Sequence, residues 1–414
     1  MYTVYLKRFA LILSMLHATS ILGMNVVRPY QILLRPPKLN DSWMQFYTVG
    51  QFGFETRSFG DDGDVGPLQI YQCNQNALAM LDGFAPSTLI GQKRIRVDAS
   101  DDGVRGHFIP CADFNLDAAM QFGLRFFMPH HLSLAFYQPV YKMTLKDVMW
   151  QSCTQNVSIE DARVSAYLTN CLAANTCALG SLDINGWSRT GVGDTTVSLE
   201  WIHDYPQQKP MLHNVTINGR LGVTIPTSLK ADEDNIFAFP YGNDGSFGLV
   251  FAIGLDLYIG KYIKAGLDVQ LMHQFGDTRC RRIKTAVDQT DLLLLAKTEV
   301  FKDFGMTQQF SFYWEFYKIF YGASFELAYQ FYKHGENTLY INSNEFSTSI
   351  ANTAQTLRSY TTHDAFIMFN YDLSDHMSED CSVVPYVSAF VDIPFNGRRA
   401  VVAKNAGFIF ALNF

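Results

Sequence analysis

The stretch FNLDAAMQFGLRFFM, residues 114–128, decides the fold. Its even-numbered positions are all apolar, whereas Asn115, Asp117, Gln121 and Arg125 occupy odd-numbered positions. A two-residue period is typical of a β-strand, because successive side chains point to opposite faces of the sheet. The run is also longer than the roughly five or six residues of a soluble strand and sufficient to cross a bilayer at a tilt. We therefore expect a membrane-crossing strand here.

The same alternation recurs along most of the chain. Between Phe247 and Leu257, for example, every odd-numbered position is apolar. About twelve strands are expected, and an even number is what a single-chain bacterial barrel needs when both termini lie in the periplasm. The expected strands are 43–57, 114–128, 132–145, 193–204, 212–225, 246–259, 262–275, 308–317, 320–333, 363–373, 383–394 and 404–414.

The connections between these strands differ in length according to their side of the sheet. The connections at the end of the sheet where the first strand begins are short: 129–131, 205–211, 260–261, 318–319 and 374–382. Those on the other side are long, except the last: 58–113, 146–192, 226–245, 276–307, 334–362 and 395–403. Short periplasmic turns and long outer loops are typical of transmembrane barrels. The fold class predicted is all-β, an antiparallel up-and-down transmembrane β-barrel of about 12 strands.

The long outer loops are expected to contain short helices. Ser158-Ile159-Glu160-Asp161 resembles a capping box that opens a helix running toward Ala173. Residues 291–304 also have helical spacing and are followed by Gly305. Reading them as another barrel strand would give an odd count and reverse the loop pattern, so we predict a loop helix there.

The N-terminus has the pattern of a secretory signal peptide. Lys7 and Arg8 precede an apolar run, Phe9–Leu16, and smaller residues follow it. The run is shorter than the ~20 residues that a membrane-spanning helix needs. The predicted organisation is a signal peptide at 1–23, a periplasmic N-terminal stub at 24–42 and an outer-membrane β-barrel at 43–414.

The composition agrees with a membrane barrel and gives no support for nucleic-acid binding. Charged residues make up 17% of the chain, below the roughly 25% of soluble domains, while Phe (33) and Tyr (21) are abundant. A net charge of -7 provides no basic surface for a polyanion. We expect no nucleic-acid partner.

The last expected strand, 404–414, ends on an aromatic residue after apolar residues at alternate positions. This ending resembles the C-terminal targeting strand of bacterial outer-membrane β-barrel proteins, a porin-like class within which no subfamily is identifiable. The resemblance implies the outer membrane of a Gram-negative-type bacterium, with membrane lipid and the barrel-assembly machinery as partners. It also implies an assembly signal at Phe408, Phe410, Leu412 and Phe414. The oligomeric state stays open.

The polar face of the strands is expected to line the lumen. Glu55 belongs to this face, and so do the predicted pore-lining residues Asp117, Arg125, Glu200, Arg220, Asp256, Lys264, Asp268, Glu315 and Glu326. Acids outnumber bases, and charge of one sign in a lumen sets ion preference. The function predicted is a porin-like channel for passive passage of small polar or cationic solutes.

Three other functions stay open. The inner charges could pair with one another in a plugged, structural barrel, or the long loops could act as an adhesin. An outer-membrane hydrolase is less favoured, because His203, His213 and His273 have outward parity without a serine of the same parity beside them. We therefore expect no enzyme and no catalytic residue.

Seven cysteines fall outside the expected strands. Exported proteins can hold disulfides, and candidate pairs are Cys73 with Cys111 and two of Cys153, Cys171 and Cys177. Unpaired loop cysteines are the alternative, and an odd total leaves at least one thiol free or intermolecular. The remaining two are Cys280 and Cys381. Paired CxxC spacing is absent, so we predict no metal site, and we expect no cofactor.

Overall fold

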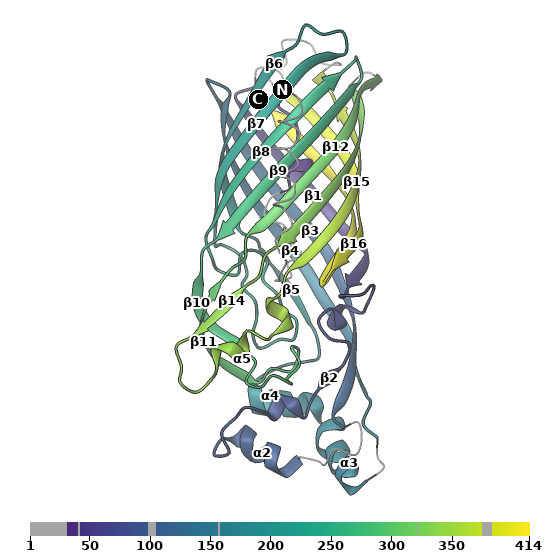
Figure 1. Cartoon of the computed structure of the whole chain (residues 1–414). Coiled ribbons are helices and arrows are strands. Elements are labelled where there is room, and N and C mark those ends of the chain that lie inside the picture. Colours follow the sequence, from purple (N-terminus) through teal and green to yellow (C-terminus); the bar gives the residue numbers. More distant parts are fainter. Residues whose placement is uncertain (1–30, 40–41, 98–104, 156–157, 321, 375–382) are drawn as a thin grey trace, which may run out of the picture.

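The computed structural model describes residues 31–39, 42–97, 105–155, 158–320, 322–374 and 383–414. The predicted signal peptide and Cys381 lie outside these residues. Figure 1 shows a tall barrel with the C-terminus at its upper end and a smaller domain, built by the long loops, at its lower end. We call the upper end of the barrel the inner end, and we call the smaller domain the outer domain.

Twelve antiparallel strands close the barrel, which confirms the predicted fold class. Each strand pairs with its neighbour in the order β1-β3-β4-β6-β7-β8-β9-β12-β13-β15-β16-β17, and β17 pairs back with β1. The strands are β1 (Met44–Phe59), β3 (His107–Met128), β4 (Leu132–Ser152), β6 (Thr195–Pro206), β7 (Leu212–Ile225), β8 (Gly248–Ile259), β9 (Ile263–Gln274), β12 (Thr307–Phe320), β13 (Ala323–His334), β15 (Tyr360–Asp372), β16 (Val384–Arg398) and β17 (Ala400–Asn413).

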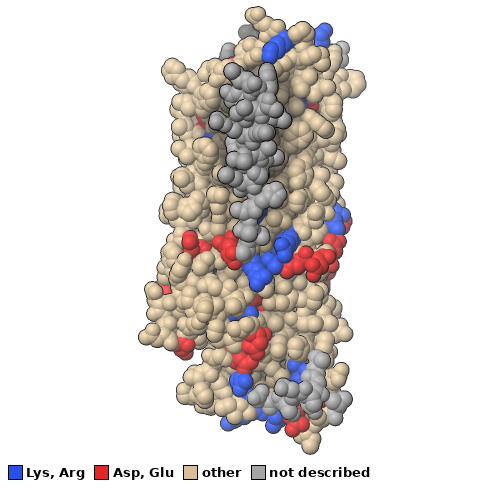
Figure 2. Space-filling view, viewed as in Figure 1, with Lys and Arg blue, Asp and Glu red and all other residues tan. Residues whose placement is uncertain are grey.

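The barrel wall is apolar on its outside. Along β8, Phe251 and Ile253 are 56% and 54% exposed, whereas Val250 and Ala252 between them are buried. Figure 2 shows a wide surface over the barrel, largely without Lys, Arg, Asp or Glu in this view, and a belt of charged residues where the barrel meets the outer domain. A water-soluble protein rarely exposes such a continuous apolar surface. This surface therefore faces lipid.

The last strand closes the barrel against the first. Phe408 and Phe410 point outward and are 64% and 44% exposed, while Ile409 and Ala411 are buried inside. The backbone carbonyl of Phe414 accepts a hydrogen bond from the Trp43 amide at 2.8 Å. This confirms the strand and its closing position. Its part in assembly stays a prediction.

Two bulges change which side chains face inward. The register shifts between Gly53 and Glu55 in β1 and between Leu116 and Ala118 in β3. Beyond the second bulge, Leu116 is buried at 4% exposure, whereas Asp117 is exposed. Asp117 accepts a hydrogen bond from the Thr144 hydroxyl at 2.7 Å on the outer surface. The prediction that Asp117 lines the pore is wrong, because one inserted residue reverses the parity.

Glu55 is displaced by the bulge in its own strand. It is exposed and pairs with Lys404, its partner in the register of β1 and β17, at 2.5 Å. The predicted luminal position of Glu55 is therefore also wrong.

The outer domain has its own small sheet and short helices. Its core is an apolar cluster that includes Phe114, Met143 and Leu293. The strands are β2 (Gln75–Asn76), β5 (Trp187–Val192), β10 (Asp277–Ile283), β11 (Ala296–Asp303) and β14 (Thr338–Ile341), of which the last three form a sheet. The helices are α2 (Leu89–Val97), α3 (Ile159–Val164), α4 (Leu172–Gly180) and α5 (Thr348–Ala351). Shorter turns are η2 (Pro67–Gln69), η3 (Ala79–Leu81), η4 (Ser165–Thr169) and η5 (Gln355–Leu357).

The two helix predictions for the outer loops had different outcomes. Ser158 caps α3, accepting a hydrogen bond from the Asp161 amide at 3.1 Å, as the sequence predicts. The helix predicted at 291–304 is wrong, since this stretch contains β11. Pairing of β11 with β10 and β14 overrides the local helical spacing. Among the described residues, no helix is long and apolar enough to cross a membrane.

The six described cysteines all carry free thiols. The predicted pairing of Cys73 with Cys111, and of two among Cys153, Cys171 and Cys177, is therefore wrong. Cys111 lies within β3, where its sulfur is 3.9 Å from the amide nitrogen of Gln69. A disulfide requires facing Cβ atoms at close range, which sequence proximity within a loop does not ensure.

Candidate functional site

A cavity of about 710 Å³ occupies the inner end of the lumen. We call it the inner cavity. Tyr258 and Lys264, which flank the turn between β8 and β9, line it together with Gly322 at the start of β13. Its charged lining residues are Arg35, Lys38, Arg125, Asp204, Asp256, Lys264, Asp268, Glu315, Glu326 and Asp372.

Apart from Asp117, the predicted pore-lining residues lie inside the barrel, and four of them form buried ion pairs. Arg125 Nη2 lies 3.1 Å from Glu200 Oε2, and Arg220 Nη2 lies 2.7 Å from Asp268 Oδ1. All four side chains are at most 4% exposed. Buried charges need such partners, since an unpaired charge costs several kcal/mol. Each pair therefore gives a partner to charges that the wall would otherwise bury alone.

The other four predicted residues form a group that borders the inner cavity. Lys264 Nζ lies 3.2 Å from Glu315 Oε2 and 3.7 Å from Asp256 Oδ2. Glu326 stands opposite Glu315 in the pairing of β12 with β13 and has no ion pair among those of the described residues. We call Asp256, Glu315 and Glu326 the acidic cluster. Two carboxylates thus lie within 4 Å of one ammonium group, and a third acidic side chain stands beside them.

Residues 31–39 cross the lumen, and we call them the luminal segment. Their only regular structure is a single turn, η1 (Ile32–Leu34). Leu33, Leu34 and Leu39 are 5–8% exposed and belong to a cluster with Tyr47 and Tyr137 of the barrel wall. The predicted periplasmic location of 24–42 is therefore wrong for residues 31–39. The aperiodic sequence gives no signal for a position inside the barrel.

Polar contacts also attach the luminal segment to the wall. Arg35 Nη1 lies 3.1 Å from Glu200 Oε2, and the Gln31 side-chain amide donates to Gln330 at 2.8 Å. The Arg125 guanidinium donates to the Pro36 carbonyl at 3.2 Å. These are side-chain contacts, and the segment does not belong to the barrel sheet. It can therefore move without breaking strand pairing.

Two further cavities continue toward the outer domain. A middle cavity of about 70 Å³ is lined by Gln31 and Leu34, so the luminal segment separates it from the inner cavity. An outer cavity of about 260 Å³ follows. Tyr332 and Tyr360 line both the middle and the outer cavity. Neighbouring cavities in this series of three are thus bordered by the same segment or the same residues.

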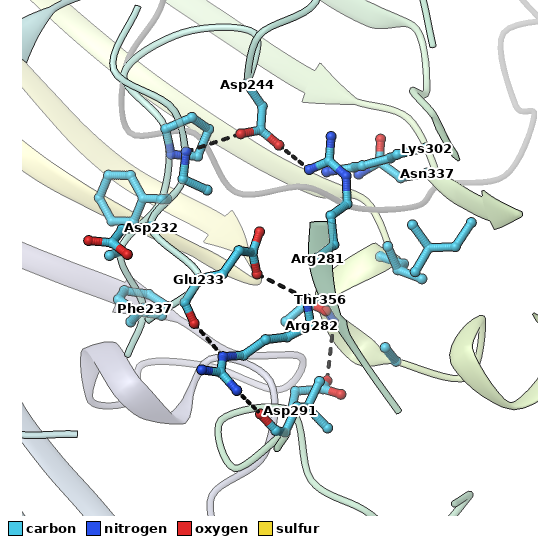
Figure 3. Close-up of a pocket in the computed structure, with 18 of the residues that line it drawn as sticks. Asp232, Glu233, Phe237, Asp244, Arg281, Arg282, Asp291, Lys302, Asn337 and Thr356 are labelled. Carbon is cyan, nitrogen blue, oxygen red and sulfur yellow. Dashed lines mark hydrogen bonds and ion pairs between the residues drawn. The ribbon is translucent and has the colours of Figure 1, made fainter. Parts of the chain in front are cut away.

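The outer cavity lies where β10 and β11 meet the loop between β7 and β8 (Figure 3). Arg279 Nη2 lies 2.8 Å from Asp244 Oδ1 and 3.0 Å from Glu233 Oε1. Arg281 also pairs with Asp244. Burial, together with the neighbouring Arg281, lowers the pKa of Lys302 to about 8. The cavity therefore has a charged wall.

A second titrating group of the outer cavity is Asp291, whose pKa burial raises to about 6 despite the nearby Lys284. Sequence reasoning assigned no site to this region. The available signal was the alternation of Asp277, Arg279 and Arg281 with smaller residues, which indicates a strand with one charged face.

The closed barrel, its apolar outer surface and its charged interior define the class: this is a β-barrel protein of the outer membrane. No family model and no curated relative matches the chain.

Solved structures of outer-membrane barrels resemble it at low sequence identity. An outer membrane channel from Pseudomonas putida F1 has a TM-score of 0.47 and 10% identity over 91% of this chain and 97% of that one. The NanC porin has a TM-score of 0.32 and 8% identity, covering 72% and 92%. A FadL homologue from Pseudomonas aeruginosa has a TM-score of 0.31 and 9% identity, covering 90% and 89%.

Proposed function

We propose that this protein is an outer-membrane channel for passive passage of small polar solutes, with a preference for cations, and that the luminal segment closes it. The observation that carries the proposal is the series of three cavities, interrupted by residues 31–39. The inner cavity, of about 710 Å³ and bordered by charged groups, gives small polar solutes room inside the barrel.

The charges of the inner cavity support the preference for cations. Six carboxylates line it, against the four cations Arg35, Lys38, Arg125 and Lys264. Glu326 adds an acidic side chain that has no ion pair among those of the described residues. An excess of carboxylates lowers the energy of a passing cation and raises that of an anion.

The contacts of the luminal segment support a closed resting state. Burying a leucine contributes on the order of 1.5–3 kcal/mol, and Leu33, Leu34 and Leu39 are all buried. The ion pair between Arg35 and Glu200 adds to this. Displacing the segment therefore costs several kcal/mol, so openings should be rare.

We also propose that the protein is not an enzyme. His203, which the sequence places on the outer face, lies in a cluster of rings and contacts two of them edge to face, with centroids 4.3 Å from His131 and 4.5 Å from Tyr205. Such aromatic groups are typical of the belt at a membrane interface. Hydrolysis of vesicle lipid, abolished by His203→Ala, would contradict this part of the proposal.

Planar-bilayer recording tests the channel. Arg35→Glu places a carboxylate against Glu200 and should raise the open fraction at least tenfold over the wild type. The matched control is Arg57→Glu, which reverses a surface charge paired with Asp64 and should not change the open fraction. Open steps should favour potassium over chloride in a salt gradient, and Glu315→Gln should reduce that preference.

The alternatives predict other results. If Arg35→Glu and a variant lacking residues 31–39 both insert and stay as silent as the wild type, the protein is a plugged or structural barrel. An adhesin working through the outer domain would give the same silence together with binding to a surface. Steps that favour chloride would contradict the assigned role of the acidic cluster.

A further inference from the structure

We propose that the outer cavity binds a small organic anion, with its carboxylate at Lys302 and Arg281 and its apolar body against the aromatic and aliphatic side chains of the same cavity. This inference goes beyond the proposed channel, since it concerns the outer domain and holds whether or not the barrel conducts.

The strands of the outer sheet bring the cations together. Alternation in β10 turns Arg279 and Arg281 toward the cavity, whereas Cys280 between them is exposed. Lys302 joins them from β11, where it pairs with Asp277 in the register of the two strands. Figure 3 shows Lys302 and Arg281 on the same side of the cavity.

The carboxylates of the cavity already have protein donors. Asp244 pairs with both Arg279 and Arg281 and accepts from the Ala231 amide at 3.1 Å. Glu233 pairs with Arg279 and accepts from the Arg282 amide at 3.0 Å. These acids are therefore not available as ligands for a further cation.

The remaining acids are occupied too. Asp232 accepts from the Asn235 side chain at 2.8 Å. Asp291 accepts from the Thr356 amide at 3.1 Å. Apart from Asp291 Oδ1, which has no hydrogen-bond donor in the described part of the chain, the acidic side of this cavity is thus satisfied by the protein itself.

The cations, by contrast, have unused donors. Lys302 has no ion pair among those of the described residues, and its ammonium group lies 4.6 Å from the centre of the Phe304 ring. Arg281 is 5% exposed, and its Nε and Nη2 atoms lack a hydrogen-bond acceptor in the described part of the chain. Its Nη2 lies 3.5 Å from Asp277, within ion-pair range but without hydrogen-bond geometry. Buried donors without acceptors are costly, and a bound anion would supply the acceptors.

The rest of the cavity indicates an apolar ligand body. In Figure 3, Phe237 lies across the cavity from Lys302. A bare inorganic ion would leave this apolar surface in contact with water, whereas an organic anion covers it. The volume of about 260 Å³ lies just below the roughly 300–1,000 Å³ of drug-sized sites, so the ligand is about one ring in size. Apolar lining residues include Phe237, Phe239, Ile283, Leu292, Leu294, Leu339 and Leu357.

Calorimetry with purified protein in detergent tests the site, with benzoate as the probe. Benzamide keeps the ring without the charge, and inorganic phosphate keeps a charge without the ring. We expect one benzoate per chain, at least tenfold tighter than either of the other two. Lys302→Gln should weaken benzoate binding at least tenfold.

The matched control is Lys297→Gln on the same strand. Lys297 is exposed and pairs with Asp234, so its loss should leave benzoate binding unchanged. Heat-dependent gel mobility establishes that each variant is folded.

Proton uptake gives a second measure of the contact between the benzoate carboxylate and Lys302. Lys302 is surrounded by Arg279, Arg281 and Asp277 of β10, by Asp244 and Glu233 of the loop, and by His334 of β13. A bound carboxylate offsets the guanidinium charges and raises the pKa of Lys302 above its value of about 8. Benzoate binding at pH 8.5 should therefore take up protons, measured from the heats in two buffers of different ionisation enthalpy.

Several results would overturn the proposal. These are the absence of benzoate binding, equal binding of benzoate and benzamide, or binding unchanged by Lys302→Gln with no proton uptake. Phosphate binding as tightly as benzoate would contradict the apolar half of the site. None of these outcomes depends on conductance. A failure of the proposed anion site can therefore be distinguished from a failure of the proposed channel function.

Discussion

Toward the inner end of β3 the side chains that face the barrel interior include the polar Gln121 and Arg125, whereas beyond its bulge the inward side chains include Phe114 and Leu116. The same strand thus has a polar inside in the membrane and an apolar inside in the outer domain. The medium outside explains the difference, because lipid takes the apolar face in one region and water takes the polar face in the other. The single residue inserted at the bulge of β3 reverses which face of the strand points inward.

The largest expected effect comes from the buried ion pairs of the barrel. Arg220→Met leaves Asp268 without its ion-pair partner and should destabilise the protein by about 3–5 kcal/mol. Arg57→Met, which removes an exposed pair with Asp64, should change stability by at most about 1 kcal/mol. Urea unfolding of the two variants in lipid measures the difference, and equal effects would mean that the interior pairs are as hydrated as the surface pair.

The apolar interior of the outer domain should respond to loss of volume. Leu116→Ala removes a side chain that is 4% exposed and should cost about 2–5 kcal/mol. Leu221→Ala, on the lipid-facing side of β7 and 54% exposed, should leave the outer domain as resistant to protease as the wild type. If both variants were digested at the same rate, the two regions would not be distinct in packing.

The pH dependence of the outer domain should come from Asp291. Burial raises its pKa from 3.8 to about 6, so the folded state holds the proton more tightly than the unfolded state does. The stability that this gives is present below about pH 4 and lost as the pH rises through 6, a change of about 3 kcal/mol. Thermal unfolding of the outer domain, followed by proteolysis, should show this loss, and Asp291→Asn should abolish it. A wild-type profile that is flat from pH 4 to 7 would contradict the assignment.

The smallest expected effect is at the edge of the outer domain. Ser158→Ala removes the cap of α3 and should cost about 1 kcal/mol, seen as faster hydrogen exchange in that helix. Ser87→Ala, at an exposed position, is the control. Unchanged exchange in α3 would show that its packing, rather than the cap, fixes the helix end.

The barrel could be predicted from sequence because its two signals are local. Alternation sets each strand, and the lengths of the connections sort the loops by side, so the strand order and the inward position of Glu200 and Lys264 follow directly. The features that sequence reasoning missed depend on long-range contacts. The bulge at Asp117 breaks no hydrophobic run, and β11 is a strand only because β10 and β14 pair with it.

The luminal segment and the outer cavity were missed for the same reason. Residues 31–39 have no period, and their place in the lumen depends on contacts with residues as distant as Glu200 and Gln330. The cations of the outer cavity come from two strands that face the loop between β7 and β8. Pairing of such distant segments leaves no pattern in a single sequence.

The most direct test of the account is to lock the luminal segment in place. The side-chain ends of Gln31 and Gln330 are hydrogen-bonded at 2.8 Å, so their Cβ atoms are separated by about the length of two side chains. Gln31→Cys with Gln330→Cys, in Arg35→Glu protein whose native cysteines are changed to serine, can therefore be joined by a short bis-thiosulfonate cross-linker that a reductant cleaves. Conductance is recorded from the same bilayer before and after adding a reductant. We predict silence while the cross-link holds and cation-selective steps after reduction. Steps of the same size and frequency in both states would show that ions do not pass where residues 31–39 lie, and would contradict the account.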